Sequence, residues 1–136
     1  SLGNTVGILA EPEEIWAQIR TAVTDPQRIR KSDPGRPEVC NVYSLHEFFS
    51  PSSDLPDIAE KCRTAQRGCV DCKKILAENI AREFAPFRER AATYREEPKL
   101  VLDILAQGAE RARTLALETM DEVRNRMGMD WRKRFA

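Results

Sequence analysis

The sequence predicts an all-α fold, a helical bundle of about five to six helices with an irregular loop after the first helix. Apolar residues recur at steps of three and four along most of the chain, and no segment alternates convincingly with the period of two that marks a strand. Prolines, glycines and short polar residues separate these periodic stretches. The 136 residues, 41% of them apolar, suit one domain with a real hydrophobic core.

The first helix is expected to begin at Pro12, because proline fits a first helical turn and the glutamates around it favour the positive end of the helix dipole. It should stop near residues 24–26, and the turn-rich segment through 33–37 is expected to be irregular. The buried side of this helix should carry the apolar residues Ile15, Trp16, Ile19 and Val23.

A second helix is expected over 37–49, "PEVCNVYSLHEFF", and a third from a cap at Asp54 to about Ala65. Gly68 should interrupt the chain before a fourth helix begins near Val70. The Phe48-Phe49 pair and Trp16 lie on apolar helical stripes, so we expect them in the core rather than in a platform that stacks on bases.

The fourth helix is expected to be the longest and to continue past Pro86, which should kink it. A short helix over 100–107 should then lead to Gly108, and a final helix should end at Gly128. The apolar face of the fourth helix consists of Leu76, Ile80, Phe84, Phe87, Ala91 and Tyr94. The apolar face of the final helix consists of Ala112, Ala116, Met120, Val123 and Met127.

Composition excludes several classes of protein. No apolar run approaches the roughly 18 residues of a membrane span, and the N-terminal residues lack the pattern of a secretory signal, so we expect a cytoplasmic protein with no membrane partner. The 22 basic and 22 acidic side chains cancel, so any binding of nucleic acid must depend on local patches. With one histidine and no glycine-rich phosphate loop, a self-contained active site is not expected.

The cysteines form the pattern C-x21-C-x6-C-x2-C at Cys40, Cys62, Cys69 and Cys72. This spacing lacks the two close pairs of a zinc ribbon, whereas a four-iron four-sulfur cluster tolerates irregular spacing of its cysteines. Zinc, ordinary reduced thiols and disulfides remain alternatives. A zinc site could recruit His46, which is otherwise expected to be a packed or surface side chain.

Four blocks of sequence resemble bacterial tryptophanyl-tRNA synthetases, a family within the class I aminoacyl-tRNA synthetases. "SLGNTVGIL" is similar to the tail of the KMSKS loop, and "AQIRTAVTDPQRIRKSDPGRPEVC" resembles the segment that follows this loop. "GCVDCKKILAENI" and "ILAQGAERARTLALETMDEVRNRMGM" resemble the C-terminal helices of the family. The order of these blocks is specific, and the resemblance extends from Ser1 to about Met129.

The resemblance implies a domain division and a parent activity. Residues 1–10 would be the remnant of the KMSKS loop and a linker, 11–129 the helical anticodon-binding domain, and 130–136 a C-terminal tail. The parent enzyme would be a tryptophan–tRNA ligase that uses ATP and magnesium and is a homodimer. This fragment would lack the catalytic Rossmann domain, retain only Ser1 and Asn4 of the ATP loop, and be catalytically inactive and monomeric.

The resemblance also implies a site. Some members of the family carry a four-iron four-sulfur cluster beside the anticodon-binding surface, and Cys40, Cys62, Cys69 and Cys72 match its ligands. The partner would be the anticodon stem-loop of tryptophan tRNA, bound by Arg63, Arg67, Lys73 and Lys74. Two other classes stay open: an independent iron–sulfur redox or sensor protein, and a structural helical interaction domain with reduced thiols.

Overall fold

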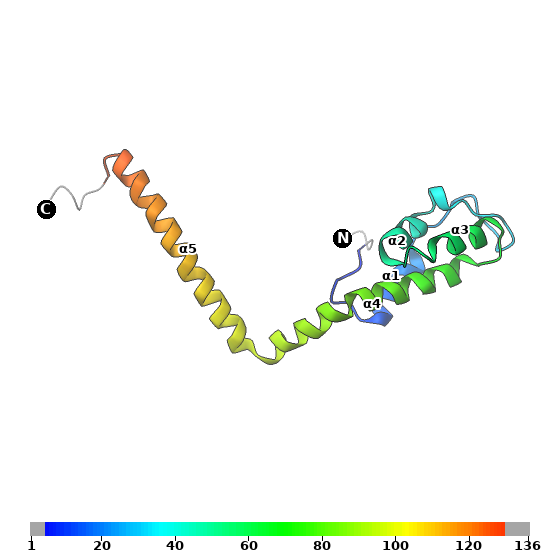
Figure 1. The fold of residues 1–136 in the computed structure, drawn as a ribbon, viewed down its shortest axis with the longest axis horizontal. Helices are drawn as coiled ribbons and strands as arrows, with labels where there is room; N and C mark the ends of the chain where they lie inside the picture. The colour runs from blue at the N-terminus through cyan, green and yellow to red at the C-terminus, as the bar shows by residue number, and fades with distance from the viewer. Residues whose placement is uncertain (1–4, 130–136) are drawn as a thin grey trace. The chain divides into compact units, whose positions relative to one another are not determined.

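The computed structural model describes residues 5–129, and every regular element in this range is a helix (Figure 1). The expected all-α class is therefore confirmed. The chain divides into two compact units, residues 1–91 and 92–136. The expected loop remnant at Ser1 and Asn4 and the tail over 130–136 lie outside the described residues.

Helix α1, Pro12–Thr21, begins where the sequence predicts. Glu11 and Glu14 form a capping box, in which the Glu11 backbone N–H donates to the Glu14 carboxylate at 2.9 Å. Ile15 and Ile19 are buried as expected. Val23 is 69% exposed, contrary to expectation, because the helix ends before this residue and the apolar stripe is not continued.

The loop after α1 is irregular, as predicted, and a buried carboxylate organises it. Asp25 is only 4% exposed and accepts hydrogen bonds from the backbone of Gln27 and of Arg36 at 3.0 Å each. The Arg36 guanidinium adds two more, from Nε at 3.1 Å and Nη2 at 2.7 Å. These four bonds close the segment between the two residues into a fixed loop.

The expected single helix over 37–49 is divided. A 3-10 turn, η1, covers Pro37–Val39, and α2 covers Asn41–Phe49. Cys40 takes an extended conformation (φ −94°, ψ 112°) between them, so the buried Cys40 becomes the N-cap of α2. Of the aromatic pair, Phe49 packs edge-on against Phe84 at 5.8 Å between ring centres, whereas Phe48 is 81% exposed, contrary to the prediction.

Helix α3, Leu55–Arg63, ends slightly before the expected Ala65, which has a positive φ of 56° that a right-handed helix does not allow. Helix α4, Cys69–Glu96, passes through Pro86 without ending, as predicted. Leu76 and Ile80 are buried on α4, but its stripe is not buried throughout, since Phe87 and Tyr94 are 37% and 48% exposed.

Within the first unit, α1, α2 and α3 gather around the N-terminal half of α4 (Figure 1). The contact of α1 and α2 with α4 forms one core, against which Trp16, Phe49 and Phe84 pack from its edge. The buried members of this core are Ile15, Ile19, Cys40, Val42, Leu76, Ala77 and Ile80.

The second unit contains α5, Pro98–Arg126. The expected division at Gly108 is wrong, because α5 is one continuous helix of 29 residues. A single glycine costs a helix only about 1 kcal/mol, and the alanine, leucine, arginine and glutamate around Gly108 are strong helix formers. None of its residues is buried. Among residues 5–129, no helix combines the length and the apolar character needed to cross a membrane.

The Asp25 carboxylate should make the stability of the fold sensitive to acid. Hydrogen bonds from the Arg36 side chain and the Gln27 backbone hold the pKa of Asp25 well below its usual range. An unfolded aspartate binds its proton near pH 3.9 (about the ordinary value), so the unfolded state takes up the proton first and stability falls below about pH 4. We expect Asp25→Asn to lower the thermal midpoint at pH 7 and to flatten this acid dependence.

The measurement is thermal unfolding by circular dichroism from neutral pH to pH 3. Asp103→Asn is the control, because it removes an exposed carboxylate of α5. If Asp25→Asn and Asp103→Asn matched the native chain at every pH, the loop would not depend on the Asp25 carboxylate.

Candidate functional site

The four cysteines come from three helices of the first unit. Cys40 caps α2, Cys62 lies in the last turn of α3, and Cys69 and Cys72 lie in the first turn of α4. Cys40 is buried and the other three are partly buried. The sequence predicts these four residues as ligands, and all four are free thiols.

The Cys62 sulfur lies against the loop after α1. The Gly35 backbone N–H donates to the Cys62 carbonyl at 3.0 Å, and a Cβ added to Gly35 would stand 2.5 Å from the Cys62 Sγ. Arg28 Nη1 lies 3.8 Å from the same sulfur. Burial raises the pKa of Cys62, Arg28 opposes this shift, and the neighbouring Cys40 and Cys69 add to it.

The Cys72 sulfur belongs to a buried polar network. His46, which is fully buried, places Nε2 3.3 Å from both the Cys72 Sγ and the Cys72 carbonyl. His46 Nδ1 lies 2.6 Å from the Ser50 hydroxyl, which accepts a hydrogen bond from Asn79 Nδ2 at 2.8 Å. A proton on His46 Nε2 lets every member donate in one direction along this chain of hydrogen bonds. Of the packed and surface positions expected for His46, the structure shows the packed one.

Burial and charge keep the Cys72 thiol protonated. Burial is the main cause that raises the pKa of Cys72 to about 12; the neighbouring Cys40, Cys62 and Cys69 add to this rise, and Arg67 opposes it. Burial likewise lowers the pKa of His46, which favours the neutral ring.

By residue type the donor set has the chemistry of a cysteine-only cluster, and the one histidine of the sequence is engaged by Ser50 and Cys72. Residues 5–129 nevertheless contain no group of three or more His, Cys, Asp or Glu side chains arranged to hold a metal ion. The cluster therefore stays a prediction.

The four predicted RNA-binding cations do not form one free patch. Arg63 pairs with Glu38, and Arg67 pairs with Asp57 at 3.0 Å while its side chain is only 18% exposed. The Lys73 ammonium donates to the Arg20 carbonyl at 2.8 Å. The remaining cation, Lys74, lies in a separate pocket beside Pro12 and Trp16 on α1.

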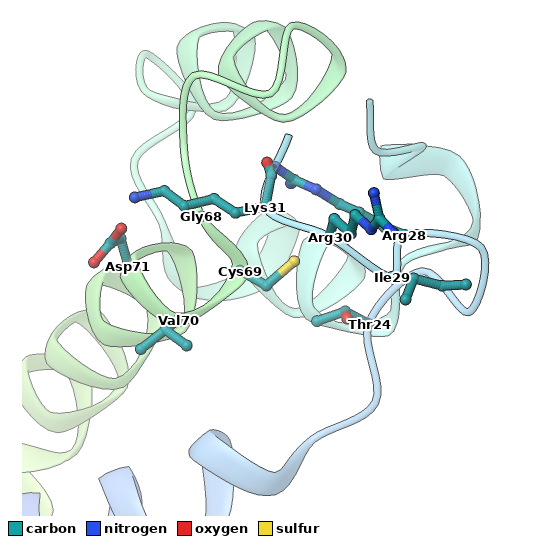
Figure 2. Close-up of a pocket in the computed structure, with 9 residues that line it drawn as sticks. All are labelled: Thr24, Arg28, Ile29, Arg30, Lys31, Gly68, Cys69, Val70 and Asp71. Atoms are coloured by element: carbon teal, nitrogen blue, oxygen red, sulfur yellow. Dashed lines mark hydrogen bonds between the residues drawn. The ribbon is translucent and has the colours of Figure 1, made fainter. Parts of the chain in front are cut away.

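Sequence reasoning missed the basic run at residues 28–31, which it assigned only to the irregular loop. Arg28 Nη2 donates to the carbonyl of Lys31 within the loop at 3.0 Å and to the carbonyl of Arg67, just before α4, at 2.9 Å. Arg28, Arg30 and Lys31 and the first turn of α4 line a pocket of about 450 Å³, and Figure 2 shows these side chains. The signal was the run "RIRK" itself, but its importance depends on which element the loop contacts.

The sequence of this chain matches a known protein family. Residues 1–85 match the family described as tRNA synthetases class I (W and Y), and the chain belongs to this family.

Its relatives narrow the comparison to one enzyme. The tryptophan–tRNA ligase of Deinococcus radiodurans is 47% identical over 128 residues, which cover 94% of this chain and 39% of that protein. The tryptophan–tRNA ligase of Thermotoga maritima is 40% identical over 130 residues, which cover 95% of this chain and 40% of that protein. The crystal structure of tryptophanyl-tRNA synthetase from Campylobacter jejuni superimposes with a TM-score of 0.82 at 27% identity, covering 92% of this chain and 40% of that one. The chain spans about two fifths of the length of these relatives.

Gly35 lies so close to the Cys62 sulfur that a side chain at position 35 should not fit. We expect Gly35→Ala to destabilise the chain by about 1–3 kcal/mol, because the added methyl group overlaps the Cys62 sulfur and the buried backbone around it cannot move freely. Urea denaturation followed by circular dichroism measures this change.

Gly108→Ala is the matched control. Nothing lies within 4 Å of a Cβ at Gly108 inside α5, so this change should be neutral or stabilise by up to about 1 kcal/mol. A Gly35→Ala chain as stable as the native one would mean that the loop can move away from Cys62.

Proposed function

We propose that this chain is the C-terminal, anticodon-binding domain of a bacterial tryptophan–tRNA ligase. The observation that carries the proposal is the match to such ligases over nearly the whole chain, at up to 47% identity in those compared. The partner is tryptophan tRNA, through the anticodon stem-loop. The single-stranded bases of an anticodon are read by stacking and by hydrogen bonds to base edges, while basic side chains hold the phosphates.

The parent enzyme joins tryptophan to this tRNA with ATP and magnesium. It is cytoplasmic and homodimeric. Within it, this chain contributes recognition of RNA.

Two positively charged side chains of the first unit are exposed and complementary to the phosphates of RNA. Arg63 is about half exposed at the end of α3 despite its pair with Glu38, and Lys74 is exposed on α4. Arg67 and Lys73 are tied to protein groups, so they would contribute charge from fixed positions. A preformed cationic surface binds with less loss of conformational freedom than a mobile one.

We further propose that Cys40, Cys62, Cys69 and Cys72 hold a four-iron four-sulfur cluster, with zinc or no metal as the alternatives. The support is the cysteine-only donor set, its partial burial, and the electrostatic coupling among its members. When bound, the cluster would tie α2, α3 and the start of α4 together. The protein's own part is to gather the thiols, to exclude water from them, and to hold the Cys72 sulfur beside His46.

Binding of RNA tests the proposed function. We expect the chain to bind a fluorescein-labelled CCA anticodon stem-loop more tightly than the same stem with a scrambled loop, and to lose affinity as salt rises. Lys74→Ala should weaken binding and flatten the slope of log affinity against log salt by roughly 0.7–0.9, if its ammonium contacts one phosphate.

Fluorescence anisotropy over a range of salt concentrations measures both quantities, with Lys99→Ala on α5 as the control for loss of one exposed positive charge. Equal affinity for the cognate and scrambled loops would contradict a role in reading the anticodon.

Metal analysis tests the cluster. After anaerobic reconstitution with iron and sulfide, the chain should be brown and contain about four irons, and Cys62→Ser should lose most of them. Val70→Ala, beside two proposed ligands but without a sulfur, should keep its iron. A single tightly bound zinc in repeated anaerobic preparations, with no iron, would show that the four cysteines form a different site.

A further inference from the structure

The pocket between the loop after α1 and the start of α4 has the character of a site for a charged ligand. Its volume is about 450 Å³, and it is lined by Arg28, Arg30 and Lys31 from the loop and by Asp71 from α4 (Figure 2). Three cations face one carboxylate, so the pocket has an excess of positive charge and is complementary to an anion.

The structure leaves two of these cations available. Arg30 and Lys31 are exposed, and neither side chain has an ion pair or hydrogen bond within residues 5–129. Arg28, in contrast, is fixed by the carbonyls of Lys31 and Arg67, and its buried Nε finds no partner among the described residues. Arg28 therefore holds the loop in place while its neighbours keep their charge for a ligand.

Apolar side chains border the same cations. Ile29 is 87% exposed and Val70 is 55% exposed, and both line the pocket. Gly68 forms part of the lining, and Lys31 Cε lies 3.4 Å from where a Cβ on Gly68 would stand, so the lysine stem extends over the start of α4 (Figure 2). Free cations beside exposed apolar groups suit a ligand with an anionic group and a flat apolar face, which is the chemistry of a nucleotide.

We propose that this pocket binds one nucleotide of a single-stranded RNA loop, with its phosphate against Arg30 and Lys31 and its base against Ile29 and Val70. The inference rests on the proposed function, because it takes the RNA to be the anticodon loop. The main contact with RNA would then lie on the loop after α1 and the start of α4. Lys74 lines a different pocket, beside Trp16.

The test compares two double variants that each remove two exposed positive charges. Arg30→Gln/Lys31→Gln changes the pocket, and Lys99→Gln/Arg113→Gln changes α5. Fluorescence anisotropy with the CCA stem-loop should show about tenfold weaker binding at low salt for the pocket variant. Its slope against log salt should flatten by roughly 0.7, because the proposed contact neutralises one phosphate of a single strand. The α5 variant should retain its affinity within about twofold.

A third variant separates the base from the phosphate. Ile29→Ser keeps all charges, so it should weaken binding by about threefold and leave the salt slope unchanged. Circular dichroism checks that each variant keeps its fold. We expect it to do so because the substituted side chains are exposed.

The outcomes distinguish the two levels of the proposal. If the native chain binds the stem-loop and the pocket variant matches the α5 variant in affinity and slope, the pocket is not the site and the proposed function stands. If the native chain binds no RNA, both are wrong. Loss of affinity and slope in the pocket variant alone, with loss of affinity at constant slope for Ile29→Ser, supports the nucleotide pocket.

Discussion

The buried carboxylate of Asp25 is the constraint on which the irregular part of the structure depends. A segment without regular secondary structure must still satisfy its backbone, and Asp25 accepts from the backbone of Gln27 and Arg36 and twice from the Arg36 side chain. The pairing with Arg36 compensates for burying the charge. The loop that results delivers Gly35 to α3 and Arg28 to the start of α4.

Arg28 of that loop contacts Cys62 of the cysteine site and also lines the basic pocket. Arg28 directs Nη1 toward the Cys62 sulfur and Nη2 toward the Lys31 and Arg67 carbonyls. Its Nε and the Nη1 of Arg67 are buried without a partner within residues 5–129. Unpaired buried donors are costly, and in native proteins such groups tend to mark functional sites.

The position of Cys72 depends on a different set of contacts. Asn79, Ser50 and His46 form a line of hydrogen bonds that ends at Cys72, and each donor has an acceptor. A satisfied polar network favours one arrangement of the side chains around it, whereas apolar packing alone tolerates several. The α2–α4 contact thus holds Cys72 in one place.

The sequence by itself determined the all-α class, the start of α1 and the passage of α4 through Pro86, because these depend on periodicity and on the chemistry of single residue types. It could not determine the break at Cys40, the exposure of Phe48 or the continuity of α5 through Gly108, where packing or helix propensity outweighs a local signal. Only the tertiary structure decided that Arg67 and Lys73 are engaged, whereas the side chains of Arg30 and Lys31 have no partner within residues 5–129. A charge's availability depends on the groups that face it in space, and the contact between residues 28 and 67 is not a periodic property of the chain.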